Sequence, residues 1–522
     1  MNDLPRRTFL RSSVAVGGVA GLMGSAALLN QPSVGLPNQV IGGRPSLTHG
    51  VQSGDVGTTT ATVWARSDRP ARLMVEVARD DRFRNPVRLR GPRTTFGTDL
   101  TGRIGLRGLP PGRDLSYRIW ADDPDGGRPG RPVVGRLRTA PARKDDVRFL
   151  WSGDIAGQGW GIDPAYGGYR IADAMAARDA DFFLCSGDTV YADGPLTEKV
   201  ALPDGRTWTN LVTVEKSKVA ESLHEFRGQY KYNLMADNWR RFLAQTPQVN
   251  QWDDHEVTNN WYPGEILDDA RYTEKSVDVL ARRAKQAFHE YVPINPRQSD
   301  ADGRIYRVIH HGPSLDVFVL DMRTYKDPNT ANGETRSDGG VLGRKQTRWL
   351  LDELRRSKAT WKVIAADLPL GLVVPDGTTA QEGLAQGDPG LPLGRERDIA
   401  EVLTGLQRLG IRNHVWLTAD VHYTAAHHYS PDRAAYQRFD PFWEFVSGPL
   451  NAGAFGPNAL DGTFGPEAVY VEAPPKANTS PAEGFQFFGE VQIDGRTEEL
   501  TVQLRGIDGG VRHQTTLTPA RR

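Results

Sequence analysis

Residues 181–188 read DFFLCSGD, and the chain continues as TVYADG through residue 194. A short apolar run that stops at turn-forming residues is typical of a buried strand. Gly187 and Asp188 follow the run, so the carboxylate stands where the strand ends. Tyr191 comes three residues later. We therefore expect a strand that brings an aspartate, with a phenol close behind it, to one edge of a sheet.

The same arrangement recurs along the chain, where three further apolar runs lead into Asp154, Asp367 and Asp420. Helix-like segments such as residues 344–355 lie between the runs, a pattern typical of an α/β layered domain. Ligands in such domains bind beyond the carboxyl ends of the strands, so we expect the four aspartates at one sheet edge. Alternation at residues 485–517 predicts two or three antiparallel strands that complete the second sheet.

Several carboxylates at one edge would repel one another and shift toward protonation unless cations neutralised them. Oxygen-rich ligand sets favour hard cations such as calcium, manganese or oxidised iron. Cys185 is the only cysteine, which excludes an intrachain disulfide framework and thiolate-held zinc or iron–sulfur clusters. A single Gly-Asp turn is more often a capped turn than a ligand, but the repeated pattern indicates a metal site.

A different pattern occupies residues 46–140. Short segments with period-two alternation of Val, Trp and Tyr are separated by turns, which predicts an all-β sandwich. The turn at residues 109–112 ahead of Tyr117 resembles a fibronectin type III module. Acids and histidines do not cluster in this segment, so we assign it packing and spacing roles. A polar stretch ends it, and we expect the catalytic domain at 145–522.

Residues 1–45 have the composition of an export signal and linker. Arg6 and Arg7 precede an apolar pair, and an uncharged Gly/Ala-rich stretch follows at 14–29. This stretch is shorter than the roughly 20 residues that a membrane-spanning helix needs. The arginine pair resembles the twin-arginine type of signal, which predicts the twin-arginine export machinery as a partner and a periplasmic or secreted protein. A chance Arg-Arg beside an amphipathic helix is the alternative.

The overall composition is that of a globular protein, with 38% hydrophobic and 25% charged residues among 522. Because 64 basic residues balance 64 acidic ones, the chain has no global field that would attract nucleic acid or an anionic membrane. Local charged patches remain possible. We expect no specific nucleic-acid partner and a monomer.

Four blocks in order carry a resemblance to a known family: residues 152–161, 187–194, 252–260 and 419–422. Their order resembles the calcineurin-like metallophosphoesterases. Gly187-Asp188 followed by Tyr191, together with the WDDHEVTNN block and the N-terminal sandwich, is more closely similar to PhoD-type alkaline phosphatases and phospholipase D-type phosphodiesterases. The resemblance covers nearly the whole chain and implies a layered αββα metallophosphoesterase domain behind a fibronectin III-like sandwich.

The resemblance also implies a set of metal ligands. These are Asp154, Asp188, Tyr191, Asp254, Asp367, Asp420 and His422. In the family, the residue matching Asp188 bridges two metals, and a phenolate such as Tyr191 suits ferric iron. Asp253 and Asn259 are rivals to Asp254 in the same turn. The expected cofactors are Fe3+ and Ca2+, with Mn2+ or Zn2+ as alternatives; aspartates in place of the superfamily's histidines at 367 and 420 favour the harder cations.

The implied activity is hydrolysis of phosphomonoesters, phosphodiesters or both by a metal-activated hydroxide. His255 would protonate the leaving alkoxide, and Arg323 would clamp a phosphate by bidentate bonds unless it forms a structural ion pair. A phospholipase D-type phosphodiesterase is the alternative enzyme, with phospholipid head groups rather than small phosphoesters as its substrate. A non-catalytic surface protein with structural calcium sites is the alternative from another class.

Overall fold

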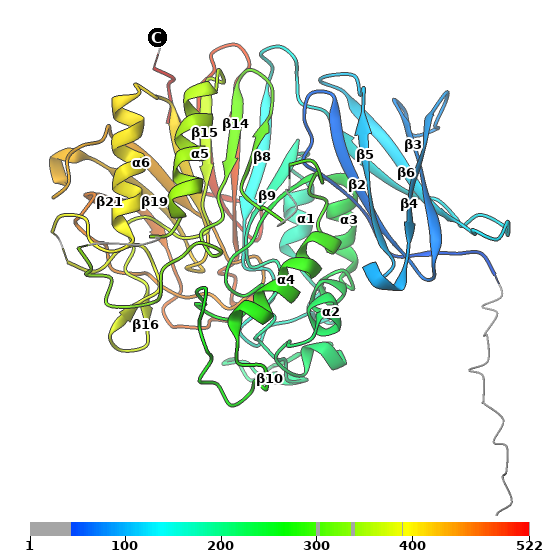
Figure 1. Cartoon of the computed structure of the whole chain (residues 1–522), viewed down its shortest axis with the longest axis horizontal. Coiled ribbons are helices and arrows are strands. Elements are labelled where there is room, and N and C mark those ends of the chain that lie inside the picture. Colours follow the sequence, from blue (N-terminus) through cyan, green and yellow to red (C-terminus); the bar gives the residue numbers. More distant parts are fainter. Residues whose placement is uncertain (1–42, 299–302, 336–339, 389, 521–522) are drawn as a thin grey trace, which may run out of the picture. The chain divides into compact units, whose positions relative to one another are not determined.

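The apolar run at 182–186 forms strand β9 (Phe182–Ser186) of the computed structural model, which Figure 1 shows. All five of its residues are buried. The structure describes residues 43–298, 303–335, 340–388 and 390–520. Residues 44–522 form one unit, Met1–Gly43 the other. The expected export signal therefore lies almost entirely outside the described residues. In the part of the chain that is described, no helix is long and apolar enough to cross a membrane.

Two large sheets form the core of the domain that carries the predicted site. The first has the order β24 (Val511–Leu517), β23 (Leu500–Gly506), β22 (Phe487–Ile493), β8 (Val147–Ser152), β9, β12 (Gln248–Gln251), β1 (Leu47–Gly54), β2 (Thr60–Ser67) and β5 (Thr101–Arg107). The second has the order β13 (Arg307–His310), β14 (Leu315–Val319), β15 (Trp361–Ala365), β18 (His414–Thr418), β20 (Phe442–Val446), β19 (Thr424–Tyr429) and β21 (Pro466–Glu472).

Alternating side chains along these strands build three apolar layers, because successive residues of a strand point to opposite faces. Phe149 of β8 packs in a cluster with Val317 and Val363 of the second sheet, so the two sheets face each other. Leu150, the next residue, packs with the helices on the outer face of the first sheet. These helices are α1 (Ile171–Ala176), α2 (Leu223–Asn233), α3 (Asp237–Gln245) and α4 (Val277–Tyr291).

Helices α5 (Gly343–Arg356) and α6 (Glu396–Arg408) cover the outer face of the second sheet, where they lie side by side (Figure 1). Leu350 of α5 and Leu403 of α6 pack in one cluster with Ile364 of β15. The helix predicted at 344–355 corresponds to α5. The layered αββα architecture expected from the sequence is confirmed.

Two expectations about strand placement are corrected. The strands of the C-terminal stretch, β22 to β24, pair onto β8 and so extend the sheet of β8 and β9, not the sheet of β14, β15 and β18. The four strand-end aspartates do not share one sheet edge either. Asp154 and Asp188 follow strands of the first sheet, whereas Asp367 and Asp420 follow strands of the second. Short-range sequence patterns do not identify the sheet that a strand joins, because the strand's pairing partner can lie far away in the sequence, as β8 does for β22.

The N-terminal β-sandwich is present. One of its sheets has the order β4 (Val87–Thr94), β3 (Ala71–Ala78), β6 (Asp114–Asp122) and β7 (Val133–Arg138). It packs on β1, β2 and β5 through a shared apolar cluster. Those three strands are also the end of the nine-stranded sheet, because Gly54 of β1 pairs in parallel with Gln248 of β12. The sandwich and the α/β domain therefore share a continuous sheet, which the sequence did not predict.

The remaining elements are short. Two hairpins are formed by β10 (Lys199–Ala201) with β11 (Thr207–Thr209), and by β16 (Pro375–Asp376) with β17 (Ala380–Gln381). Single turns of 3-10 helix are η1 (Phe96–Thr98), η2 (Val214–Lys216), η3 (Pro431–Arg433) and η4 (Pro481–Glu483).

A buried ion pair secures the junction between the sandwich and the second sheet. Asp55, directly after β1, lies 2.7 Å from Nη2 of Arg307, the first residue of β13, and both side chains are 1% exposed. The Asp55 carboxylate also accepts a hydrogen bond from the Asn295 backbone N–H at 2.8 Å. Arg307 donates in addition to the Asn250 carbonyl of β12. Both charges are thus fully paired, so loss of either side chain would leave the other charge buried without a partner.

We expect Asp55→Ala to lower the free energy of unfolding by about 3–5 kcal/mol, because Arg307 would keep its charge without a buried partner. Asp179→Ala is the matched control, since Asp179 pairs with Arg136 and Arg138 but is 60% exposed. Asp179→Ala should lower the free energy of unfolding by about 0–1 kcal/mol. Urea denaturation measures both variants. Equal losses would show that the Asp55–Arg307 pair does not secure the junction.

Candidate metal centre

The strand-end residues of the site share an unusual backbone conformation. Asp154, Asp188, Asp420 and His422 have φ values of 59°, 48°, 66° and 59°. Non-glycine residues seldom adopt this left-handed region, although Asp, Asn and His tolerate it best. Each such residue costs about 1–3 kcal/mol, and such residues cluster at functional sites. The backbone therefore turns sharply at the end of β8, β9 and β18, which aims these side chains at a common point.

The first group of possible metal ligands combines Asp154, Asp188 and His422, whose ligand atoms lie within 4.8 Å of one another. Tyr191 joins this group, because its hydroxyl lies 2.9 Å from Nε2 of His422. All four residues are buried. Neither carboxylate oxygen of Asp154 has a hydrogen-bond partner among the described residues. Two unpartnered buried oxygens are costly in a protein interior, so the position favours a cation.

Hydrogen bonding of His422 orients it as a metal ligand. Its Nδ1 lies 2.5 Å from the Gly453 carbonyl and donates to it. The other ring nitrogen, Nε2, is thereby left as an electron-pair donor facing Asp154 at 3.8 Å. Burial lowers the pKa of His422 to about 4, which keeps the imidazole neutral. A neutral imidazole is the form that binds a metal.

The second group combines Asp188, Asp254 and His255, so Asp188 belongs to both groups. The backbone N–H of His255 donates to Oδ1 of Asp254 at 2.9 Å and to Oδ1 of Asp188 at 3.2 Å. Asn260 N–H donates to the other Asp254 oxygen at 2.6 Å. A third group combines Asp253, Asp254 and Asp420. Asp188 thus has the position that a bridging ligand requires.

The His255 side chain is fixed by a carboxylate that the sequence did not single out. Its Nδ1 donates to Oδ1 of Asp193 at 2.7 Å, and Asp193 accepts a second hydrogen bond from the Asn259 backbone N–H. The imidazole also stacks on the Tyr191 ring, with centroids 4.2 Å apart. Burial lowers the pKa of His255, but the charges of Asp193, Asp254 and Asp188 outweigh it and raise that pKa well above its usual value.

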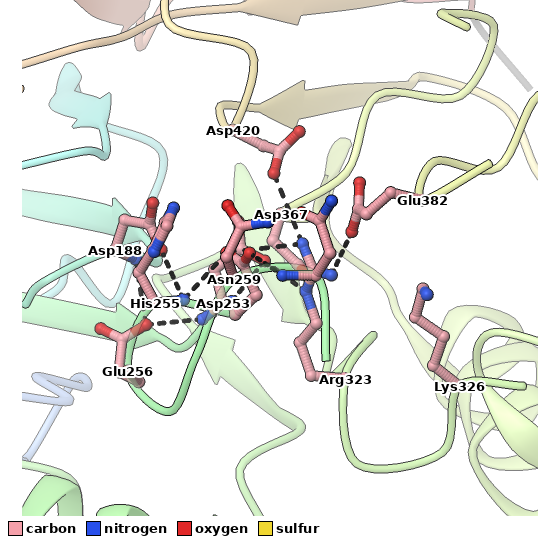
Figure 2. A network of polar contacts seen from close by, with 12 residues as sticks. Asp188, Asp253, His255, Glu256, Asn259, Arg323, Lys326, Asp367, Glu382 and Asp420 are labelled. Carbon is pink, nitrogen blue, oxygen red and sulfur yellow. Dashed lines mark hydrogen bonds and ion pairs between the residues drawn. The ribbon is translucent and has the colours of Figure 1, made fainter. Parts of the chain in front are cut away.

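Arg323 lies in the middle of the carboxylates from both sheets, as Figure 2 shows. Its side chain is fully buried. The guanidinium pairs with Asp253 at 2.5 Å and with Glu382, and it lies 3.4 Å from both Asp367 and Asp420. Every side of the guanidinium therefore faces an acid of the chain itself. This arrangement supports the structural ion pair, and the phosphate-clamp role of Arg323 stays a prediction.

Asp367 lies outside the three groups of possible metal ligands. Its Oδ1 accepts a hydrogen bond from Nε2 of Gln251 at 3.0 Å, while its Oδ2 faces Arg323. It belongs to none of the three groups of possible ligands found among the described residues. Its role as a metal ligand is therefore the least supported of the predicted set, and a role as counter-ion to Arg323 fits its contacts better.

Glu256 ties the two turns of the site together. Its carboxylate accepts hydrogen bonds from the backbone N–H groups of Thr189 at 2.6 Å, Asp253 at 2.8 Å and Asp188 at 3.1 Å. Gly187 makes this approach possible, because its φ is +97° and a Cβ there would lie 2.4 Å from the Asp253 Cβ. The Gly-Asp turn and the WDDHE turn are thus held in contact by one buried side chain.

The protein surroundings favour the neutral form of several carboxyl groups at the site. Burial, reinforced by the charges of Asp253 and Asp254, raises the pKa of Asp154 well above its usual range. Burial and the charges of Asp254 and Asp253 do the same to Asp188. Burial raises the pKa of Tyr191 as well, with Asp188 and Asp154 adding to the effect. Bound cations would reverse these shifts, because they stabilise the charged forms.

The donor atoms fit hard metal ions. Carboxylate, imidazole and phenol groups converge from the two sheets, and no thiol takes part in the groups found among the described residues. The orphaned oxygens of Asp154 mark where one cation would lie. Asp154, Asp188, Tyr191 and His422 would hold one metal, whereas Asp188, Asp254 and Asp420 would contribute to a second.

The structure therefore brings together most of the predicted residues and adds others. Asp154, Asp188, Tyr191, Asp254, Asp420, His422 and His255 all converge. Sequence reasoning missed Asp193, Glu256 and Glu382. The first two lie within quoted blocks, two residues after Tyr191 and directly after His255. Glu382 had no local signal, because it reaches Arg323 from the end of the β16–β17 hairpin.

Comparisons with known proteins identify relatives of this chain. The family model described as "PhoD-like phosphatase" matches residues 149–504, and the model described as "PhoD-like phosphatase, N-terminal domain" matches residues 35–141. Among curated proteins, "Alkaline phosphatase D" of Bacillus subtilis (strain 168) is 27% identical over 450 residues. The match covers 81% of this chain and 72% of that protein.

Two solved structures share the fold. "Structure of PhoD" superposes with a TM-score of 0.66 at 20% identity, over 90% of this chain and 89% of that one. A purple acid phosphatase, PPD1 from yellow lupin (Lupinus luteus), superposes with a TM-score of 0.56 at 14% identity, over 91% of this chain and 74% of that one. Because the phosphatase model spans well over half of its sequence, the chain belongs to the PhoD-like phosphatase family.

Proposed function

We propose that the chain hydrolyses phosphoesters at a site with two metal ions, and that phosphomonoesters are its preferred substrates. The observation that carries the proposal is Asp188, a buried carboxylate shared by two groups of side chains that could hold a metal ion. Membership of the PhoD-like phosphatase family supports the reaction class. The name of the Bacillus subtilis relative, alkaline phosphatase D, supports monoesters as substrates.

We infer that Fe3+ occupies the group that includes Tyr191 and that Ca2+ occupies the group of carboxylates. Phenolate and imidazole ligands suit oxidised iron, whereas an all-oxygen set suits calcium. When bound, the two cations would polarise the phosphoryl oxygens and lower the pKa of water. Asp188 would hold them at a fixed separation. Arg323 keeps Asp253, Asp367 and Glu382 neutralised and in place beside them.

His255 is the proton donor in this proposal. Its Nδ1 is bound to Asp193, so Nε2 is the ring nitrogen left to face a substrate. The neighbouring carboxylates favour the protonated imidazolium, which can give its proton to a departing alkoxide. Asp193 would orient the ring and stabilise its charge. A structural calcium site would not require a histidine held in this way, which argues against the non-catalytic alternative.

We propose further that the protein is exported as a folded monomer by the twin-arginine route. The arginine pair ahead of an uncharged stretch supports this route, because it is read by a receptor that accepts folded cargo. Loading of metal before export would fit a site built from two sheets and several loops. Small phosphoesters outside the cytoplasm would be the substrates.

Asp188→Asn tests the bridging role. The amide removes one charge from between two cations, so metal content and turnover should fall together, with turnover lower by about 100-fold or more. Metal analysis and hydrolysis of p-nitrophenyl phosphate on one preparation measure both quantities. Asp204→Asn is the control, because Asp204 is an exposed carboxylate in the β10–β11 turn. Full metal content with normal turnover in Asp188→Asn would exclude the bridge.

His255→Ala separates proton donation from metal binding. Metal content should stay normal, while turnover of alkyl phosphates should fall by about 10²–10⁴. Turnover of p-nitrophenyl phosphate should fall much less, because its leaving group departs without a proton. Asp193→Asn should show the same dependence on leaving group with a smaller loss, since it only misplaces the ring. Loss of metal from His255→Ala, or equal losses for both substrate types, would contradict the assignment.

Replacement of Arg6 and Arg7 together by lysine tests export. The receptor distinguishes the arginine pair, so active enzyme should accumulate inside the cell. Cell fractionation followed by the phosphatase assay measures the distribution. Unchanged activity outside the cytoplasm would rule out the twin-arginine route.

A further inference from the structure

The neutral composition of the chain conceals a strong separation of charge. Residues 44–140, which form the sandwich, contain 18 arginines, no lysine and 10 acidic residues. The α/β domain carries the compensating acids, many of them in the metal centre. Charge asymmetry of this kind points to an anionic partner for the basic part. The position of the arginines within the sandwich shows where such a partner would bind.

Several of these arginines lie on β4, which is the edge strand of the four-stranded sheet. In the pairing of β3 with β4, Arg72 lies opposite Arg93 and Met74 lies opposite Arg90. The register shifts between these two pairs, so β4 contains one extra residue. This bulge allows Arg90 and Arg93, three positions apart, to face outward together with Arg72. We call Arg72, Arg90 and Arg93 the arginine surface.

The arginine surface lacks ion pairs among the described residues: none of its three arginines lies within 4.0 Å of a carboxylate oxygen there. Arg72 donates from Nη1 to the Gly91 carbonyl at 2.9 Å, and its Nε has no hydrogen-bond partner. Like charges opposite each other on paired strands are destabilising. Burial and the charges of Arg90 and Arg93 lower the pKa of Arg72, as expected for crowded cations.

Two acids on neighbouring strands make other contacts. Asp122 lies opposite Arg72 on β6 and accepts a hydrogen bond from the Trp120 indole at 2.7 Å. Glu76 pairs with both Arg88 and Arg118. Neither acid forms an ion pair with the arginine surface, so an external anion would relieve the remaining repulsion.

An exposed aromatic side chain follows the arginine surface along the chain. Phe96, three residues beyond Arg93, is 74% exposed. Arginines combined with an exposed aromatic side chain are typical of segments that lie in the head-group region of a bilayer. A soluble polyanion would be contacted by the arginines but would gain nothing from Phe96. The combination favours a lipid surface.

We propose that the arginine surface docks the sandwich onto a bilayer that contains anionic phospholipids, with Phe96 entering the interface. Lipid phosphate groups would supply the charge that Arg72, Arg90 and Arg93 lack. This contact uses none of the residues of the metal centre. If the proposed phosphoester hydrolysis holds, this contact would place that activity at a membrane surface.

Vesicle flotation of the full chain tests the proposal. Wild type should bind vesicles that contain phosphatidylcholine and phosphatidylglycerol in a 1:1 mixture, and it should bind vesicles of phosphatidylcholine alone only weakly. Rising salt should release the protein from the anionic vesicles. Arg90→Gln with Arg93→Gln should weaken binding to the anionic vesicles by about 30-fold. The control, Arg107→Gln with Arg113→Gln, changes two exposed arginines elsewhere on the sandwich and should bind like wild type. Hydrolysis of p-nitrophenyl phosphate should be the same in all three proteins.

Phe96→Ser supplies the second measurement. It should weaken vesicle binding and leave any affinity for soluble polyphosphate unchanged. Polyphosphate binding as tight as vesicle binding, with no effect of Phe96→Ser on either, would assign the surface to a polymer and overturn the proposal. Self-association of the double arginine variant with unchanged vesicle affinity would show that the arginines only protect the sheet edge. Equal binding to both kinds of vesicle would also overturn it.

Discussion

The arrangement of side chains at the centre of this protein depends on how repulsion among buried carboxylates is compensated. Acids from both sheets and from two loops converge there, and a low-dielectric interior makes each uncompensated charge costly. The chain supplies part of the compensation itself. Arg323 faces acids on every side, His255 is flanked by Asp193, Asp188 and Asp254, and Glu256 is held by backbone N–H groups. Asp154 is left without any such partner, which is why the residual negative charge points to metal ions at that position.

The fold meets this constraint by bringing the carboxyl ends of strands from two facing sheets to one place. The apolar layer between the sheets is continuous from Phe149 to Val363, so the strand ends cannot drift apart without opening that layer. Sharp left-handed turns at Asp154, Asp188, Asp420 and His422 then direct the side chains inward. The strain of these turns is tolerated because packed strands hold each turn at its start. Rigid placement of ligands is what a metal site requires.

The sandwich has a different relation to the site. It continues the first sheet and is fixed by the buried Asp55–Arg307 pair, so it is a rigid extension of the α/β domain and not a loosely tethered module. Its outer face, by contrast, leaves like charges unrelieved. The proposed membrane contact would relieve this repulsion. In that proposal the tightly paired junction fixes the sandwich to the α/β domain, and the unpaired basic face binds the membrane.

The sequence by itself determined the elements and the chemistry. Apolar runs ending in aspartate predicted the strands and the carboxylates, and the ordered blocks predicted the family and the αββα layers. It could not assign β22 to β24 to the correct sheet, join the sandwich to β12, or separate Asp367 from the metal groups. Nor could it identify Glu382 as a partner of Arg323, 59 residues away. Local patterns report what a segment becomes, because propensity and periodicity act over a few residues. Which segments meet depends on long-range packing, and only the tertiary structure decides which carboxylates receive an arginine and which are left for metals.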